Sequence, residues 1–281
     1  MKLFKISDVL LSLMFVIGLS LLLYPSVSNY WNSFRQTKAV ASYENEVANL
    51  DKDKYQEIWD NAIHFNQKLV EKGPFSKLSV SEEQEYNTLL NVDGTSMMGF
   101  VSIPSINVYL PIYHGVSDEV LQVAIGHLNW SSLPTGGEST HCVISGHRGL
   151  PSAKLFTDLN KLIEGDVFSI HVLDKVFTYE VDQILIVEPY ETNDLKIVKG
   201  EDYVTLVTCT PYGVNSHRML VRGKRNDALA ENNVRVPADA SKVKPIVVAI
   251  VLSAPILLLA FVVALFPRIK RKPITYEDLF S

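Results

Sequence analysis

Two long runs without a charged residue, one near each end of the chain, constrain the fold more than any other feature. Residues 9–34 contain no Asp, Glu, Lys or Arg, and residues 245–267, PIVVAIVLSAPILLLAFVVALFP, form a second such run. A helix of about 20 apolar residues crosses the hydrocarbon core of a bilayer. We therefore predict transmembrane helices at 9–30 and 245–267. Pro255 would kink the second helix without preventing the span.

A cleaved signal peptide is the alternative explanation of the first run. Its apolar region would usually be about 7–15 residues long and would be followed closely by a cleavage site of small residues. The best match to such a site, Ala39-Val40-Ala41, lies 15 residues beyond Tyr24. This distance favours a retained anchor.

Basic residues flank both runs on their terminal sides. Lys2 and Lys5 precede the first run, and the second is followed by Arg268, Lys270, Arg271 and Lys272. The positive-inside rule places the short ends, 1–8 and 268–281, in the cytoplasm and the segment between the runs outside. We therefore expect a cell-membrane protein with two spans and an extracytoplasmic domain.

That outer segment, residues 35–244, is acidic and poor in cysteine. It carries 20 basic and 28 acidic residues, and both cysteines of the chain lie in it. An acidic balance disfavours a nucleic-acid-binding protein, which needs a basic surface. Two cysteines are too few for a disulfide scaffold or a four-thiolate zinc site. Each cysteine is then either buried or present for its chemistry.

The part of the chain that follows the first anchor, residues 31–96, is expected to be helical. Apolar residues recur at three-to-four spacing from Tyr43 to Lys72, which predicts one amphipathic helix. Gly73-Pro74 is a typical helix end. The residues 81–84, Ser-Glu-Glu-Gln, have the form of a capping box and predict a short second helix up to Leu90.

From residue 97 the sequence has the character of short strands. Segments rich in Val, Ile, Thr and Tyr alternate with Gly, Pro, Asn and Asp, and they read GFVSIP, NVYLPIY, CVISG, VFSIHVL, VFTYEVDQILIVEP, YVTLVTC and MLVRG. One helix is expected among them, at about 152–162. Many short strands with few helices favour a closed, mainly β barrel at 97–226, followed by a linker at 227–244.

Three residues at predicted strand ends could form a catalytic site. Cys209 ends YVTLVTC, His147 follows CVISG, and Arg218 opens the next strand only nine residues after Cys209. A thiol, an imidazole and a permanent cation supply a nucleophile, a proton carrier and a stabiliser of an oxyanion. Taken singly, each has a structural alternative: a free cysteine is commonly buried and inert.

The motifs around these residues resemble those of the sortases, cysteine transpeptidases of Gram-positive bacteria. The matching stretches are TLVTCTPYG around Cys209, VISGHRGLPSAKLF around His147, SHRMLVRG around Arg218, and GHLNWSSLPTGGEST at 126–140. The resemblance implies an eight-stranded β-barrel with Cys209 as nucleophile, His147 as acid/base and Arg218 as the group that holds the substrate carbonyl. It implies no cofactor and no metal.

The second span and the helical extension resemble the class C, pilin-polymerising sortases. This resemblance implies cleavage of a Leu-Pro-x-Thr-Gly-like sorting signal between Thr and Gly, through a thioacyl-enzyme. The acyl group would then pass to a lysine amine of another pilin. Three alternatives stay open: a housekeeping sortase that attaches proteins to the cell wall, a membrane-tethered cysteine protease, and a non-enzymatic pilus-assembly scaffold.

The resemblance has one departure, in the segment expected to cover the site. Class C enzymes carry a lid with an Asp-Pro-aromatic motif, whereas the best candidate here, Gly73-Pro74-Phe75, lacks the acid. This segment would either pack Phe75 over Cys209 or be a plain helix end. His127 and Thr208 are further candidates for the substrate pocket. Cys142 alternates with Ile144 in its strand and is expected in the core.

Overall fold

The computed structural model describes residues 6–73, 75–92 and 94–232. The predicted second span at 245–267, the tail at 268–281 and most of the predicted linker lie outside these residues. Within them, one helix is long and apolar enough to cross a membrane, judged by its length and composition alone. This helix contains the predicted anchor at 9–30.

Three helices precede the barrel: α1 (Ile6–Ala48), α2 (Lys52–Lys72) and α3 (Val80–Tyr86). The single helix predicted from Tyr43 to Lys72 is wrong, because residues 49–51 are not helical and separate α1 from α2. Asp51 is the N-cap of α2, and its side chain accepts a hydrogen bond of 2.8 Å from the backbone N–H of Lys54. A carboxylate that satisfies a free amide at this point favours a new helix start over continuation.

A capping box does start α3, but two residues earlier than predicted. Ser79 is the N-cap, and the carboxylate of Glu82 accepts from the Ser79 backbone N–H at 2.7 Å. The pair is therefore Ser79 with Glu82, the third residue of the helix. The helix ends at Tyr86, short of the predicted Leu90, and Leu90 has a positive φ of 56°.

Eight strands form a closed barrel, as predicted from the sequence and its resemblance. They are β1 (Met97–Ile103), β2 (Val108–His114), β3 (Ile125–His127), β4 (Thr140–Ser145), β5 (Val167–Val172), β6 (Lys175–Val187), β7 (Asp202–Thr210) and β8 (His217–Arg225). The order around the barrel is β1-β2-β3-β4-β7-β8-β6-β5, and β5 pairs with β1. The pairs β2·β3 and β4·β7 are parallel, and the others are antiparallel. A one-turn helix, α4 (Asp118–Leu121), leads into β3.

Strand alternation separates the barrel interior from its outer face. In β4 and β7, Cys142, Ile144, Val204 and Leu206 belong to the main core. Their neighbours Val143 and Val207 belong to a different cluster, on the outer face. The core prediction for Cys142 agrees with its 3% exposure. Because successive residues of a strand point to opposite sides, each of these strands serves both faces.

The helix predicted at 152–162 is wrong. In the structure this segment is irregular apart from a 3₁₀ turn at Leu159–Lys161. Its backbone groups bond elsewhere: the Phe156 N–H donates to the carbonyl of His147 at 3.1 Å, and the Lys154 N–H donates to Asn29 at 2.8 Å. Leu155 has a positive φ of 37°. Tertiary partners therefore override the local helical preference here.

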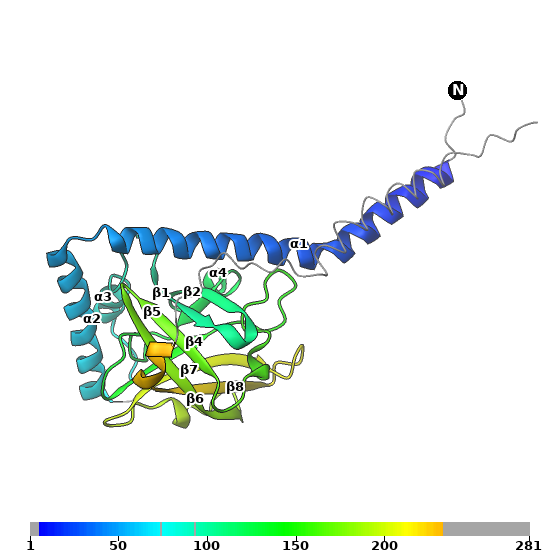
Figure 1. Ribbon diagram of the computed structural model, residues 1–281. Coiled ribbons are helices and arrows are strands. Elements are labelled where there is room, and N and C mark those ends of the chain that lie inside the picture. The colour runs from blue at the N-terminus through cyan, green and yellow to red at the C-terminus, as the bar shows by residue number, and fades with distance from the viewer. Residues whose placement is uncertain (1–5, 74, 93, 233–281) are drawn as a thin grey trace, which may run out of the picture. The chain divides into compact units, whose positions relative to one another are not determined.

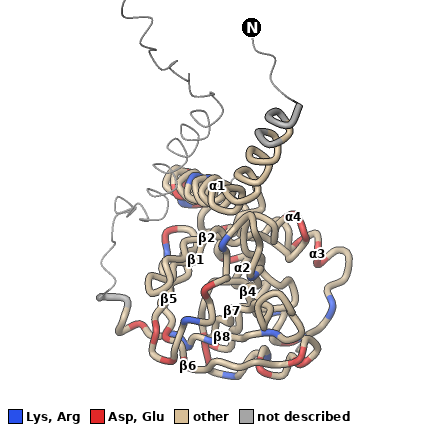
Figure 2. The backbone as a smooth tube through the Cα atoms, turned by 90° about the vertical axis from the view of Figure 1, so that its right-hand side faces the viewer, with Lys and Arg blue, Asp and Glu red and all other residues tan. Residues whose placement is uncertain are grey.

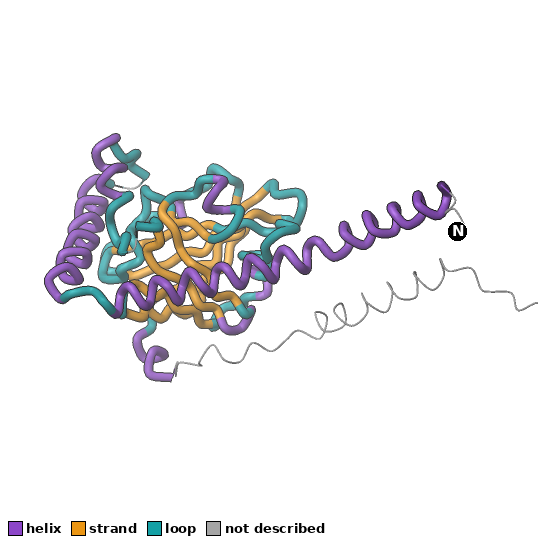
Figure 3. Tube along the Cα trace, turned by 90° about the horizontal axis from the view of Figure 1, so that it is seen from above, coloured by secondary structure: helices purple, strands orange, loops and turns teal. Residues whose placement is uncertain are grey.

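From Leu23 on, α1 lies along the barrel, and α2 stands beside the barrel at the end where α1 finishes (Figure 1, Figure 3). Val40 and Tyr43 of α1 are buried against Met97 and Phe100 of β1. The Tyr43 hydroxyl donates to the Met98 carbonyl at 3.1 Å and accepts from the Leu173 N–H at 2.9 Å. These contacts fix the second half of α1 to the domain that contains the candidate site.

Candidate active site

The three candidate catalytic residues lie level with one another at the ends of neighbouring strands. Cys209 of β7 is the direct register partner of Arg218 of β8. Ser145, the last residue of β4, is the partner of Val207, so His147 comes two residues later at the level of Cys209. Residues opposite each other in a sheet bring their Cβ atoms to about 4.5–5.5 Å. The fold therefore brings His147, Cys209 and Arg218 into one row.

Backbone and side-chain bonds fix the exit of β4 that carries His147. The Gly146 N–H donates to the Val207 carbonyl at 3.0 Å, which extends the pairing of β4 with β7 by one residue. Thr208 donates its hydroxyl to the Gly146 carbonyl at 2.8 Å. On the far side, the His147 carbonyl accepts from Phe156. These bonds hold the backbone on both sides of His147.

Arg218 is held by the turn that joins β7 to β8. Its Nη1 donates to the carbonyls of Asn215 at 3.2 Å and His217 at 3.1 Å. The next residue back, His217, lies 3.3 Å from a carboxylate oxygen of Glu188. The guanidinium thus uses one nitrogen for its own turn, and it has further N–H groups with which to bind a ligand.

A second apolar cluster, which we call the groove, lies on the outer face, one step back along the strands from this row. Its buried members are Val143, Val207, Leu220 and Leu195, and the partly buried residues packed on them are Phe75, Leu128, Trp130, Leu185 and Val187. Val207 and Leu220 are register partners, two residues before Cys209 and two after Arg218. Since strand faces repeat every second residue, the groove and the row share one face.

Phe75 occupies this groove. Its ring meets the Trp130 ring edge-on, with the centroids 5.1 Å apart. A cavity beside the two rings, of about 10 Å³, is lined in part by Gly73, His141 and Lys196. Phe75 is therefore no exposed residue at a plain helix end. It packs on the face that carries Cys209.

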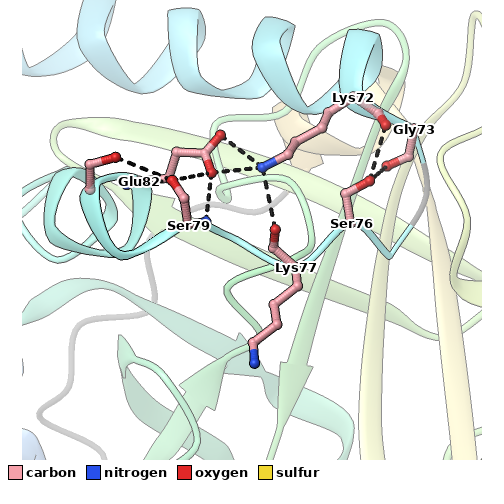
Figure 4. Close-up of polar contacts among 7 residues, drawn as sticks. Lys72, Gly73, Ser76, Lys77, Ser79 and Glu82 are labelled. Carbon is pink, nitrogen blue, oxygen red and sulfur yellow. Dashed lines mark hydrogen bonds and ion pairs between the residues drawn. The ribbon is translucent and has the colours of Figure 1, made fainter.

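The segment that carries Phe75 is braced at its base. Gly73 is the C-cap of α2, with a φ of 88° that suits glycine, and its N–H donates to the Leu69 carbonyl at 3.2 Å. The Lys72 ammonium lies 2.7 Å from a carboxylate oxygen of Glu82 (Figure 4). The bond from Lys72 lowers the pKa of Glu82 to about 2, helped by the bonds from Ser79. Pro74 lies outside the described residues.

Thr208 and His127, the candidates for the substrate pocket, are enclosed. Thr208 is 1% exposed and points away from the face of Cys209. His127 is 0% exposed and hydrogen-bonded at both ring nitrogens, to the Tyr86 hydroxyl at 2.9 Å and to the Ser132 carbonyl at 2.8 Å. Desolvation lowers the pKa of His127 to about 3. In this conformation both residues support the site from behind rather than facing a substrate.

His141 fastens the loop that forms one wall of the groove. Its Nδ1 bonds to the Lys196 carbonyl at 2.8 Å, and its Nε2 bonds to the Thr205 hydroxyl at 2.7 Å. Lys196 follows Leu195, which packs in the groove. Desolvation lowers the pKa of His141 to about 4, so the ring stays neutral. The histidine next to Cys142 is thus a structural tie.

Sequence reasoning missed a contact between the His147 loop and the turn after Cys209. Arg148 donates from Nη1 to the Thr210 hydroxyl at 3.2 Å, while its buried Nε has no partner. The Arg148 guanidinium lies 6.0 Å from the centre of the Tyr212 ring. A Cβ on Gly149 would come within 2.8 Å of that ring. The signal in the sequence was Gly149 directly after His147-Arg148, because only a glycine lets the Tyr212 ring come so close to the backbone.

Together these features form a candidate site for cysteine-based acyl transfer at the rim of a closed barrel. A half-exposed thiol faces a permanent cation, a histidine stands at its other side, and an apolar groove leads to it.

Comparisons with known proteins agree with this site. Residues 101–226 match the sortase domain. The structure of sortase C1 from Streptococcus agalactiae is 50% identical, with a TM-score of 0.66, and the match covers 67% of this chain and 98% of that one. The structure of sortase C from Streptococcus pneumoniae, described in connection with pilin substrate specificity, is 43% identical with a TM-score of 0.60. The match covers 67% of this chain and 96% of that one. The chain belongs to the sortase family.

The curated relative sortase D of Bacillus subtilis is 31% identical over 130 residues, which are 45% of this chain. The chain spans 63% of the length of that relative.

Proposed function

We propose that the protein is a membrane-anchored, extracytoplasmic sortase of class C that links pilin subunits. The observation that carries this proposal is the row of His147, Cys209 and Arg218 at the end of an apolar groove. The high identity to two sortase C structures supports the class, and the pilin specificity named for one of them supports the substrate. The substrate would be a Leu-Pro-x-Thr-Gly-like sorting signal.

In the proposed reaction, the Cys209 thiolate attacks the carbonyl carbon of the Thr–Gly bond. Arg218 donates hydrogen bonds to the oxyanion that develops, and it lies directly across the strand pair from the attacking sulfur. The C–N bond then breaks, and His147 gives a proton to the departing glycine amine. A thioester between Cys209 and the threonine carbonyl remains.

A lysine amine of a second pilin completes the proposed reaction. It attacks the thioester, His147 takes up its proton, and the thiolate leaves as the new amide forms. The apolar groove would hold the Leu-Pro part of the signal in an extended form. Since Phe75 fills part of that groove, it must shift before the peptide can bind.

Mass spectrometry of the full chain in detergent tests the proposal. A peptide with a Leu-Pro-x-Thr-Gly signal should give a covalent adduct with the protein that lacks the residues after threonine. Adding a peptide with a free lysine amine should discharge this adduct into a branched product. Discharge only to the free acid would instead indicate a protease, and no adduct at all would contradict an acyl-transfer enzyme.

A further inference from the structure

The part of α1 nearest the predicted anchor has two opposite faces of different character. One face bonds to the barrel: Asn32 Nδ2 donates to the Ser152 carbonyl at 2.9 Å, and Gln36 Nε2 donates to the Val123 carbonyl at 2.6 Å. The opposite face is formed by large apolar or aromatic side chains that are 55–65% exposed, namely Tyr24, Val27, Tyr30, Trp31 and Phe34. We call these five residues the aromatic face.

The spacing of these residues makes the aromatic face continuous. Residues three and four apart are neighbours on a helix surface, and positions 24, 27, 31 and 34 follow this rule. The rings of Trp31 and Phe34 lie 6.3 Å apart. Asn29, Asn32 and Gln36 occupy the other side of the same turns and contact the barrel. The barrel therefore cannot cover the aromatic face.

The same side of the helix changes character further along. After Phe34 it continues through Lys38, Ala41 and Asn45, all of them exposed. The barrel contacts continue on the other side through Val40 and Tyr43. The second half of α1 thus contacts the barrel along its whole length, while its outer side is aromatic only up to Phe34 and polar or small beyond it. This change indicates that the outer side of α1 has one environment up to Phe34 and another beyond it.

We propose that the aromatic face lies in the headgroup region of the outer lipid leaflet, so that α1 rests on the membrane surface with the barrel on its other side. Three observations point to lipid as the occupant. The face continues the uncharged run that begins at residue 9. It consists mainly of Tyr and Trp, which are enriched at membrane interfaces. Arg35 and Lys38 border it, where their charges reach lipid phosphates.

Figure 2 shows the corresponding distribution of charge: α1 carries no charged residue from 9 to 34, whereas charged residues are spread over the barrel. The proposal places residues 24–34 at the interface, so the membrane-crossing part of α1 would end near Tyr24 rather than at residue 30 as predicted from the sequence. A helix surrounded by lipid could not donate from Asn32 to Ser152 of the barrel. The same stretch of helix that touches lipid would therefore also touch the loop that follows His147.

Spin labelling of the full chain in nanodiscs of zwitterionic and anionic lipid tests this proposal. Single cysteines replace Val27, Trp31 or Phe34 in a Cys209→Ala background, because Cys142 is buried and takes up no label. Ser33→Cys and Ala41→Cys are matched controls, since both positions are exposed on the same helix outside the aromatic face. The measurement is the collision rate of each label with oxygen, which concentrates in lipid, and with a water-soluble nickel chelate.

We expect labels at 27, 31 and 34 to collide several-fold more with oxygen relative to nickel than labels at 33 and 41. Equal ratios at all five positions would overturn the proposal. Protection of residue 31 from both reagents would overturn it as well, because the face would then be covered by protein. Dipolar broadening between labels at 31 would identify a second copy of this chain as that cover. Circular dichroism of each variant confirms that the labelled protein is folded.

Discussion

Buried positions of the barrel and positions at its rim each contain a cysteine and a histidine, yet these residues have different surroundings. Cys142 is 3% exposed, and burial raises the pKa of its thiol well above the ordinary value. Cys209 lies half-buried at a strand end, across from Arg218. Strands β4 and β7 are neighbours, and Cys142 pairs with Val204, five residues before Cys209 and on the opposite face from it. Residue type alone therefore does not predict reactivity.

The histidines repeat this contrast. His141 and His127 have both ring nitrogens engaged in hydrogen bonds with the protein, and they are almost fully buried. His147 lies at the rim, where it is partly exposed and the backbone bonds of Gly146 and Phe156 fix its position. A proton carrier needs access to the reacting atoms, and a structural tie needs none. Accessibility to solvent therefore separates the candidate catalytic pair, Cys209 and His147, from the buried cysteine and histidines.

Removing each thiol in turn is the most direct test of the difference between Cys209 and Cys142. Cys209→Ala should lower transpeptidation by more than about 10³-fold, because no nucleophile remains. Cys142→Ala should leave the rate unchanged and lower the free energy of unfolding by about 1–2 kcal/mol through lost packing. Adduct formation and denaturant unfolding measure the two effects. An adduct that persists in Cys209→Ala but disappears in Cys142→Ala would reverse the assignment.

The next largest effect is expected at Arg218. Arg218→Ala should lower kcat by about 10²–10³-fold, the usual loss for one group that stabilises an oxyanion. Arg218→Lys should recover part of this loss, since it keeps the charge but not the planar pair of donors. His217→Ala is the matched control, because it changes the preceding residue, which contacts Glu188 instead. Equal losses for Arg218→Ala and His217→Ala would show only that the turn matters.

The sequence could predict those features of the fold and the site whose residues lie close together along the chain. The strand ends at His147, Cys209 and Arg218 follow from local alternation and turn residues, and the structure brings the three residues together. The groove does not follow in this way, because it joins Phe75, Trp130 and Leu195 from three separate segments. Local patterns hold no information about such pairings.

Local rules also failed where a tertiary partner competed with them. The segment at 152–162 has a helix-like sequence, but its amides bond to Asn29 and His147. Asn29 and Asn32 themselves lie at the end of the uncharged run, where they gave no sign of contacting a protein domain. Asp51 caps the start of α2 and thereby divides the helix predicted from Tyr43 to Lys72. In each case a side chain or backbone group satisfied a hydrogen bond that local propensity assigns elsewhere.

The enclosed histidines predict a loss of stability in acid. The pKa of His127 falls to about 3 and that of His141 to about 4 in the folded protein, against about 6.5 when unfolded. Below pH 6.5 the unfolded chain binds protons that the folded chain does not, so stability falls as the pH falls from 6.5 toward these values. At pH 5 each histidine should cost about 2 kcal/mol.

Denaturant unfolding of the full chain in detergent at pH 7.5 and pH 5 measures this loss. His141→Asn should reduce the difference between the two pH values by about 2 kcal/mol, because asparagine does not titrate. The same difference in both proteins would mean that His141 takes up a proton without unfolding. The comparison between enclosed and rim histidines would then lose its basis.

Phe75 tests how far the groove is closed. Phe75→Ala should speed the labelling of Cys209 by a small alkylating reagent by about tenfold, since a half-buried aromatic ring contributes about 1.5 kcal/mol. Tyr190→Ala is the control, because Tyr190 is 78% exposed and lies outside the groove. Unchanged labelling in Phe75→Ala would show that the ring only packs beside the site. Gly73 is unsuitable for such a test, because its φ of 88° strains any other residue.

The smallest effect concerns the link between α1 and the rim. Asn29 accepts from the Lys154 N–H through Oδ1, whereas Asn32 donates through Nδ2 to the Ser152 carbonyl. Aspartate keeps the acceptor but loses the donor. Asn29→Asp should therefore retain the wild-type rate, while Asn32→Asp places a carboxylate against a carbonyl and should lower kcat about fivefold by loosening the loop after His147. A bond of this kind contributes about 1 kcal/mol, which corresponds to this factor.

A matched control separates loop positioning from simple loss of docking. Gln36→Glu removes the same kind of side-chain amide bond on the same helix face, but its partner is Val123 and not the His147 loop. It should lower the free energy of unfolding about as much as Asn32→Asp without changing kcat. The pH dependence of kcat adds a second readout. If the His147 loop is less well fixed, the part of the pH profile that reports the ionisation of His147 should shift in Asn32→Asp and stay unchanged in Gln36→Glu. If Gln36→Glu and Asn32→Asp alter kcat and its pH dependence equally, α1 stabilises the barrel as a whole. A difference confined to Asn32→Asp would instead mean that the helix nearest the membrane fixes one side of the catalytic rim.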